Sequence, residues 1–285
     1  MTQYMEKGLR IDYLKRLFTP YKKNGNINCF LFQYLQGSGN ELKEKFWSEK
    51  SSSRLCFDLY SWMGSDPSVS AIEFELKLPG IKSGGRQISP NMDVYFETKD
   101  GIYFIESKYT ETVNNKEYKN NLPQAYWKTD NHYKSVSGKD VYYPIIDRYH
   151  KYKFIMDEFV QFTENVDNMV SKEDEKVWFD AKQETCHLLG IALYAVMKKP
   201  GKPIHFFNVA ANYCSDKPLF AEAFRARSEE MLNRIFAKYS VGISFDYQLC
   251  SVRDFFGRML WLDKKGYATD RTVRELISEY SEPIR

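Results

Sequence analysis

Apolar and charged residues alternate regularly in the centre of the chain. From Ile72 to Leu76 every second residue is apolar and the residues between them are glutamates, so residues 71–77 are predicted to form a strand with one buried face. Two more apolar runs, about 92–98 and 102–109, flank Lys99-Asp100-Gly101, and an Asp-Gly pair in this setting is a strong signal for a β-hairpin. Three consecutive strands are therefore predicted here.

Helices and two further strands are predicted around this central part. Helices are expected at about 41–49, 52–63, 177–198, 219–239, 251–262 and 269–280, a buried strand at about 204–210 and a further strand at about 241–249. In 52–63, Leu55, Leu59 and Trp62 share one face, and the preceding serines are typical N-cap residues. Residues 1–40 are rich in turn residues, 80–85 are expected to form a flexible loop, and 112–150 show no clean periodicity. The order of elements predicts an α/β fold with a central mixed β-sheet flanked by helices.

Length and composition set the broad class. The chain has 285 residues, 43% hydrophobic and 28% charged, as expected for one globular domain with a full core. We expect one domain over 1–285, with an N-terminal extension of helices and loops at 1–50 and a loop-rich insertion at 112–150. There is no apolar run of about eighteen residues and no signal-peptide pattern, so we expect a cytoplasmic protein without a membrane partner. The five scattered cysteines form no CxxC pair, which argues against structural zinc and disulfides.

The distribution of charge is more informative than its sum. A net charge of +3 is too small to identify a nucleic-acid-binding protein. Residues 108–153, however, contain lysines interleaved with tyrosines and a tryptophan, which suits a surface that contacts phosphates and stacks on bases. A solvated loop with some buried tyrosines would show the same pattern. The lysines predicted to contact nucleic acid are Lys116, Lys119, Lys128 and Lys134.

The predicted hairpin brings chemically active side chains together. Glu106 and Lys108 are two residues apart on one strand, so they project from the same face. With a two-residue loop Asp93 lies opposite Lys108, and with a four-residue loop it lies opposite Glu106. Both registers place Asp93 on the face of Glu106 and within cross-strand reach. A three-residue loop would place it on the other face, unless a bulge restored the register.

Such a pair of carboxylates predicts a metal site. Carboxylates a few ångströms apart repel each other unless a cation lies between them. Mg²⁺ suits this position because it takes oxygen ligands and keeps several waters, and Mn²⁺ is expected to substitute for it. The predicted ligands are Asp93, Glu106 and the main-chain carbonyl of Ser107. Lys108 would orient the attacking water or stabilise charge on the phosphate, as in metal-assisted hydrolysis of a phosphodiester.

These residues also resemble a known signature. Pro90-Asn91-Met92-Asp93, followed by Glu106-Ser107-Lys108, resembles that of the PD-(D/E)xK nuclease superfamily, which includes many restriction and repair endonucleases. The usual proline–aspartate pair is stretched here, and the run is similar to a bacterial branch of restriction-endonuclease-like proteins. The resemblance covers roughly residues 50–280. It implies a restriction-endonuclease-like three-layer sandwich, with Asp93 and Glu106 as metal ligands and Lys108 as the catalytic lysine.

The resemblance implies further site residues. Many members have an upstream glutamate that supports a second metal ion, for which Glu75 is our choice and Glu73 the reserve, although a solvated edge strand explains both equally well. The following helix often has a glutamine near the site, and Gln183 occupies that place. His187 stands where related nucleases can have a tyrosine. It shares a helix face with Gln183 and could reach the scissile phosphate or a metal-bound water, but we expect a half-buried structural histidine there. His205, inside an apolar strand, is also expected to be structural.

These observations predict a Mg²⁺-dependent endonuclease that cleaves DNA in restriction, defence or DNA processing. Cutting both strands of a palindrome requires two active sites related by symmetry, which predicts a homodimer for that case. The alternative is a non-catalytic module on the same fold that binds nucleic acid or another partner. A third interpretation is an ordinary cross-strand ion pair that matches the D…ExK pattern by chance. No separate DNA-reading element is evident, so loops such as 112–150 would carry any specificity.

Overall fold

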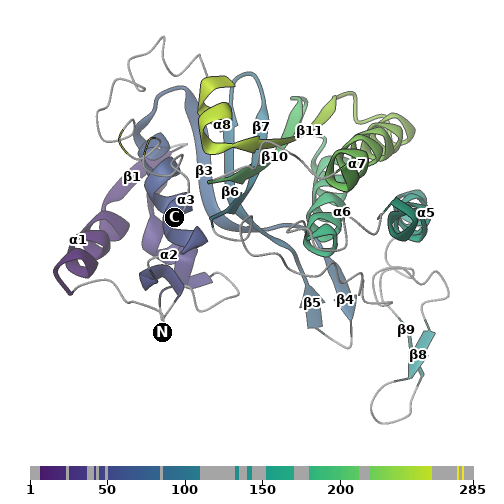
Figure 1. Cartoon of the computed structure of the whole chain (residues 1–285), viewed down its shortest axis with the longest axis horizontal. Coiled ribbons are helices and arrows are strands. Elements are labelled where there is room, and N and C mark those ends of the chain that lie inside the picture. Colours follow the sequence, from purple (N-terminus) through teal and green to yellow (C-terminus); the bar gives the residue numbers. More distant parts are fainter. Residues whose placement is uncertain are drawn as a thin grey trace.

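The computed structural model shows an α/β fold built on a mixed sheet of five strands in the order β11-β10-β7-β6-β3 (Figure 1). The strands are β3 (Val69–Lys77), β6 (Asn91–Thr98), β7 (Ile102–Lys108), β10 (Ile204–Ala210) and β11 (Phe245–Ser251). β3, β6 and β7 pair antiparallel, whereas β7, β10 and β11 pair parallel, so the predicted mixed sheet is confirmed. The structure describes residues 7–23, 26–36, 42, 45–48, 51–83, 86–109, 132–134, 140–142, 152–169, 180–211, 219–258, 275 and 278.

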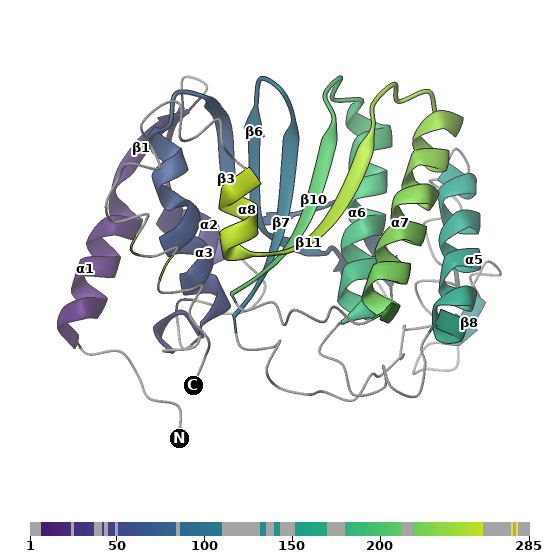
Figure 2. The ribbon, with the colours of Figure 1, turned by 45° about the horizontal axis from the view of Figure 1, so that its top comes forward.

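Helices lie on both sides of the sheet, which gives three layers (Figure 2). One side holds α5 (Lys153–Met169), α6 (Ala181–Lys198) and α7 (Leu219–Lys238), and the other holds α1 (Lys7–Phe18), α2 (Phe30–Gln36), α3 (Ser52–Tyr60) and α8 (Val252–Arg258). Each side has its own hydrophobic core. We call the core between the sheet and α5–α7, which includes Phe104 and Phe206, the first core, and the one that includes Phe74 and Phe207 the second core.

Short elements complete the described part. They are the 3-10 turns η1 (Lys45–Trp47) and η2 (Ser61–Ser65) and the hairpins β1 (Pro20–Lys23)–β2 (Asn26–Cys29), β4 (Ile81–Ser83)–β5 (Arg86–Ile88) and β8 (His132–Lys134)–β9 (Asp140–Tyr142). The hairpin β4–β5 corrects the expected flexible loop at 80–85. The helix expected at 41–49 is only the turn η1 in the described residues, and β11 begins at Phe245 rather than near 241.

Several local expectations are met. Ser51 caps α3, because its hydroxyl oxygen accepts a 3.1 Å hydrogen bond from the Arg54 amide. Within the predicted insertion 112–150, Lys134 lies in β8, whereas Lys116, Lys119 and Lys128 lie outside the described residues. The described helices include none long and apolar enough to cross a membrane.

Candidate active site

The loop of the β6–β7 hairpin sets the position of Asp93. The strand pairing runs from Val94 opposite Ile105 to Glu97 opposite Ile102, so the loop is the four-residue form, Thr98 to Gly101. The Thr98 hydroxyl accepts hydrogen bonds from the Asp100 and Gly101 amides and thereby closes the turn. Continued by one residue, this register places Asp93 opposite Glu106.

The two strands separate at Asp93. The paired part of β6 and β7 ends at Val94 and Ile105. The amide of Ser107, two residues further along β7, donates to Asp93 Oδ2 at 2.8 Å instead of to a backbone carbonyl. The carboxylate of Asp93 therefore takes the place of a strand–strand hydrogen bond.

β3 changes its buried face at Glu75. Phe74 is buried in the second core, whereas Leu76 packs against the first core. Glu75, between them, has a φ of 54°, an uncommon value for a residue other than glycine. The alternation predicted for 71–77 is therefore wrong from Leu76 onward, because the left-handed residue reverses the side on which the following side chains lie. On β6, Met92 and Val94 also lie in different cores, so both strands rotate next to Asp93.

Glu106, Lys108 and Gln183 form a closed triangle of hydrogen bonds. Lys108 Nζ donates to Glu106 Oε1 at 2.6 Å and to Gln183 Oε1 at 2.7 Å. Gln183 Nε2 donates to the same Glu106 oxygen at 2.7 Å. Gln183 lies in the first turn of α6, where Asp180 caps the helix by accepting from its amide. The structure thus brings together residues from β7 and α6 that are far apart in the sequence.

The charges of this cluster are not balanced. Burial raises the pKa of Asp93 well above its ordinary range, and Glu106 and Glu75 raise it further; Lys108 and the Ser107 amide oppose the shift without cancelling it. Burial alone would lower the pKa of Lys108, but Glu106 and Asp93 raise it above the usual value, so the side chain stays an ammonium ion. The positive charge of Lys108 therefore does not compensate for the burial of the Asp93 carboxyl group, whose pKa stays raised.

His187 is buried against Glu106 instead of being half-buried. Its Nδ1 lies 3.5 Å from Glu106 Oε2, and both atoms are buried without a hydrogen-bond partner among the described residues. Burial lowers the pKa of His187, so the ring is neutral near pH 7. The second oxygen of Glu106 is consequently a buried acceptor that no donor in the described chain satisfies.

Glu184, which the sequence did not single out, lies behind the triangle. Its carboxyl group accepts hydrogen bonds from Asn208 Nδ2 at 2.7 Å and from the Tyr247 hydroxyl at 2.6 Å. Asn208 is directly opposite Glu106 in the parallel pairing of β10 with β7. Burial raises the pKa of Glu184 to about 8, and Glu106 adds to the shift. A polar residue inside the apolar strand 204–210 was the signal that could have found Asn208.

These residues fit a divalent cation in part. Among the described residues, no three histidine, cysteine, aspartate or glutamate side chains converge on one point as a ready-made metal cage. Mg²⁺ does not need such a cage, because it binds through one or two carboxylates and keeps waters. The unsatisfied Glu106 oxygen and the raised pKa of Asp93 are both effects that a nearby cation would remove. The Ser107 backbone lies at the same place, and its carbonyl stays a predicted ligand.

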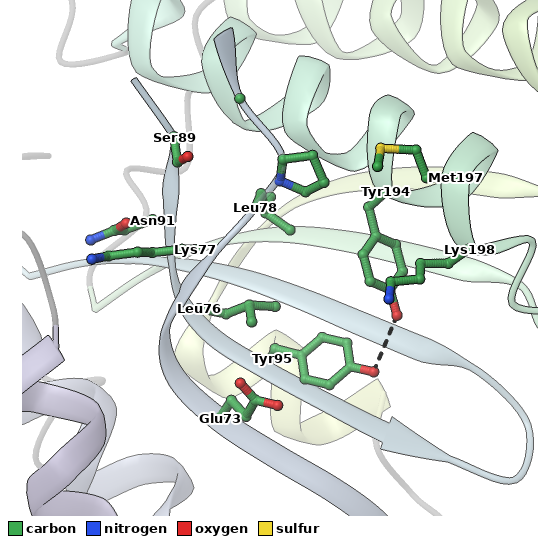
Figure 3. A pocket seen from close by; sticks show the side chains of 12 residues that line it. Glu73, Leu76, Lys77, Leu78, Ser89, Asn91, Tyr95, Tyr194, Met197 and Lys198 are labelled. Carbon is green, nitrogen blue, oxygen red and sulfur yellow. Dashed lines mark hydrogen bonds between the residues drawn. The ribbon is translucent and has the colours of Figure 1, made fainter. Parts of the chain in front are cut away.

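The two upstream glutamates have different surroundings. Glu75 lies close enough to raise the pKa of Asp93, and Asn91 Nδ2 donates to it over 3.5 Å. Glu73 instead lines a pocket with Tyr95, shown in Figure 3. This placement favours Glu75, our first choice, as the upstream acid. His205 is at the opposite ends of the strands, where it pairs with Asp246 and stacks on Tyr103.

Comparisons with family models, curated proteins and solved structures found no match for this chain. The assignment of the candidate active site therefore depends on the residues and their geometry in this chain.

Proposed function

We propose that this protein is a metal-dependent nuclease that hydrolyses phosphodiester bonds of DNA with Mg²⁺, for which Mn²⁺ can substitute. One observation carries the proposal. Glu106, Lys108 and Gln183 form a hydrogen-bonded triangle, and Asp93, bound to the Ser107 amide, is near enough for Glu106 to raise its pKa further than Lys108 lowers it. A structural ion pair would not need a second carboxylate whose charged form is destabilised.

Each residue has a role that its contacts support. Mg²⁺ bound by Asp93 and Glu106 would supply a Lewis acid for the phosphate and lower the pKa of a water. Lys108, held by Glu106 and Gln183, presents a fixed ammonium group that can orient the attacking water or stabilise negative charge on the phosphate. Gln183 fixes both of its partners and thereby limits their side-chain freedom. Glu75 and the Ser107 carbonyl are candidates for further metal contacts.

The biological setting belongs to the same proposal. The D…ExK pattern and the arrangement of a mixed sheet between two helical layers support a restriction-endonuclease-like fold. DNA as the substrate, a role in restriction, defence or DNA processing, and a cytoplasmic location follow from that resemblance. Where both strands are cut, the protein would act as a homodimer.

A cleavage assay with supercoiled plasmid DNA tests the proposal. We expect nicking in Mg²⁺, none in EDTA, and a rate lower by about 10²–10⁴-fold for Lys108→Met and Asp93→Asn. Gln183→Ala removes only a positioning contact and should lower the rate by on the order of 10²-fold or less. Lys182→Met, which changes an exposed lysine of the same helix, is the matched control and should cleave normally. Equal nicking by all the variants would contradict the assignment.

A second candidate, a non-catalytic binding module, is favoured by one observation. Glu106 Oε1 already accepts from both Lys108 and Gln183, and no three-ligand cage exists among the described residues. A module of this kind would use the cluster to stabilise the fold. Calorimetric titration with Mn²⁺ separates the two functions, because the nuclease binds the ion through Asp93 and the module does not bind it.

A further inference from the structure

A pocket opens beside the candidate active site, between the second half of α6 and the edge of the sheet (Figure 3). Its volume is about 850 Å³, which lies within the usual range for small-ligand sites. β3 and β6 form one wall, and Tyr194, Met197 and Lys198 of α6 form the other. No residue of the pocket belongs to the hydrogen-bonded triangle of Glu106, Lys108 and Gln183.

Two tyrosines give the pocket a rigid aromatic wall. The rings of Tyr95 and Tyr194 are 6.4 Å apart with their planes inclined by 63°, and their hydroxyl groups approach to 3.5 Å. The Tyr95 hydroxyl also donates to Glu97 at 3.0 Å, and Glu97 is paired with Lys202. The rings are thus fixed before any ligand arrives, which lowers the entropic cost of binding a flat molecule.

The remaining lining offers both apolar surface and charge. Leu76 and Leu78 lie beside the tyrosines, and Met197, a large apolar side chain, is 46% exposed. Glu73 is next to Tyr95, where a carboxylate can accept from an amino group. Lys77 and Lys198, both exposed, lie on opposite walls and can contact phosphates that flank a bound base.

The pocket is joined to the candidate active site through Asn91. Asn91 lines the pocket, its side chain donates to Glu75, and its backbone is hydrogen-bonded to His187, which abuts Glu106. Along α6, Tyr194 follows Gln183 by eleven residues, about 16 Å at 1.5 Å per residue. A strand bound at Asp93 and Lys108 could therefore reach the pocket a few nucleotides from the bond that is cut.

We infer that this pocket binds a single unpaired nucleobase of the substrate strand, and that it favours a base with an exocyclic amino group, such as cytosine. The ring stacks on Tyr194, which is partly exposed and is held by the buried Tyr95, as bases stack on aromatic side chains in single-strand binding sites. The amino group donates to Glu73, in the way that glutamate accepts from cytosine N4. This inference rests on the proposed nuclease function and adds a preference for substrates with an extrahelical or single-stranded base.

Photo-cross-linking of the full-length protein tests the pocket without catalysis. Single-stranded oligonucleotides that contain 5-iodocytosine are bound in EDTA and irradiated, and the modified peptides are mapped by mass spectrometry. We expect adducts at Tyr194. In equilibrium binding, Tyr194→Ala should weaken affinity for oligodeoxycytidylate by about tenfold, as loss of one stacked base does, whereas Tyr194→Phe should retain most of it. Tyr239→Ala, at a half-buried tyrosine after α7, is the control.

A second variant addresses base preference without disturbing the core. Glu73→Gln changes an exposed side chain and should remove the preference for oligodeoxycytidylate over oligothymidylate, whereas Glu230→Gln on α7 should not. Adducts confined to residues outside the pocket, or equal affinity for both oligonucleotides in the unaltered protein, would overturn the inference. If plasmid is cleaved in Mg²⁺ while these results fail, the pocket alone is refuted. If neither cleavage nor binding occurs, the proposed function fails with it.

Discussion

A charged carboxylate at Asp93 would bind a metal ion but destabilises the fold when no metal is present. Burial of the carboxyl group raises its pKa, and the nearby Glu106 and Glu75 raise it further. A carboxyl group whose pKa is higher in the folded protein than in the unfolded chain holds its proton more tightly when folded. Its contribution to stability is therefore lost as the pH rises from the ordinary aspartate value of about 4 toward the raised value. Near pH 7, without metal, Asp93 should destabilise the fold.

Asp93→Asn should consequently make the metal-free protein more stable. Asparagine keeps an oxygen that can accept from the Ser107 amide and removes the charge. We expect the melting temperature in EDTA at pH 7.5 to rise by a few degrees, about 1 kcal/mol or more, and the gain to vanish near pH 4. Asp12→Asn, at an exposed helix position, should change little. A lower melting temperature for Asp93→Asn would show that its charge stabilises the fold.

At the level of elements, the fit of α6 on the sheet depends on Gly190. A Cβ atom there would lie 2.7 Å from Pro90 Cγ and 2.8 Å from Leu78 Cβ, too close for any real contact. Neither atom is the far end of a flexible side chain, so the helix or the β3–β6 edge must move. Gln183, two turns earlier on α6, would then shift away from Glu106.

Gly190→Ala should therefore reduce both stability and cleavage. Overpacking of this kind costs about 1–3 kcal/mol, which thermal unfolding would reveal. The rate of plasmid nicking should fall by more than the decrease in folded protein, because Gln183 would no longer be positioned to contact Glu106 and Lys108. Gly257→Ala is the matched control: nothing lies within 4 Å of the added atom, and alanine favours the helix α8. Wild-type behaviour of Gly190→Ala would mean that the helix tolerates a shift.

Glu184 connects three elements, α6, β10 and β11, through a carboxyl group with a pKa of about 8. Because the unfolded value is about 4.5, stability should fall as the pH rises from about 4.5 to about 8. The slope is at most roughly 1.4 kcal/mol per pH unit for one group. Glu184→Gln should flatten this slope and be the more stable protein at pH 8.5. Unfolding in denaturant at several pH values measures this pH dependence of stability, with Glu230→Gln as the control. Parallel curves of stability against pH for Glu184→Gln and the wild type would contradict the prediction.

The sequence predicted most of the elements that build the sheet, for physical reasons that are local. Alternation, turn residues and helix caps act over a few residues, so β6, β7, β10, α6 and α7 are recovered nearly to their ends. The helix α5 was not assigned, although Ile155, Phe159 and Phe162 have helical spacing and are buried. The reversal at Glu75 could not be predicted, because no glycine marks the left-handed residue.

The part of the candidate site that lies on the β6–β7 hairpin was predicted from strand geometry. Strand parity predicted Asp93 on the face of Glu106 for a loop of two or four residues, and the loop has four. The contact with Gln183 followed the resemblance. Glu184 was not recognised as a partner of the site, and His187 was expected to be half-buried, since α6 is buried around most of its circumference and its pattern does not say how deeply each side chain lies. Burial of polar groups depends on how layers pack, and that information is spread over the whole chain.

At the scale of the whole molecule, the carboxylates of the candidate active site, which Lys108 does not neutralise, predict that the stability of the protein depends on divalent cations. A ligand that binds only the folded state stabilises it by about 2.7 kcal/mol at a hundred times its dissociation constant. The wild-type melting temperature should therefore rise by several degrees in saturating Mg²⁺ or Mn²⁺, relative to NaCl of equal ionic strength. Asp93→Asn should respond little, although it starts from a higher value in EDTA. The two titration curves should then cross, with the wild type the more stable protein once metal is bound. A parallel rise would place the ion elsewhere, and no rise in the wild type would favour a binding module over a nuclease.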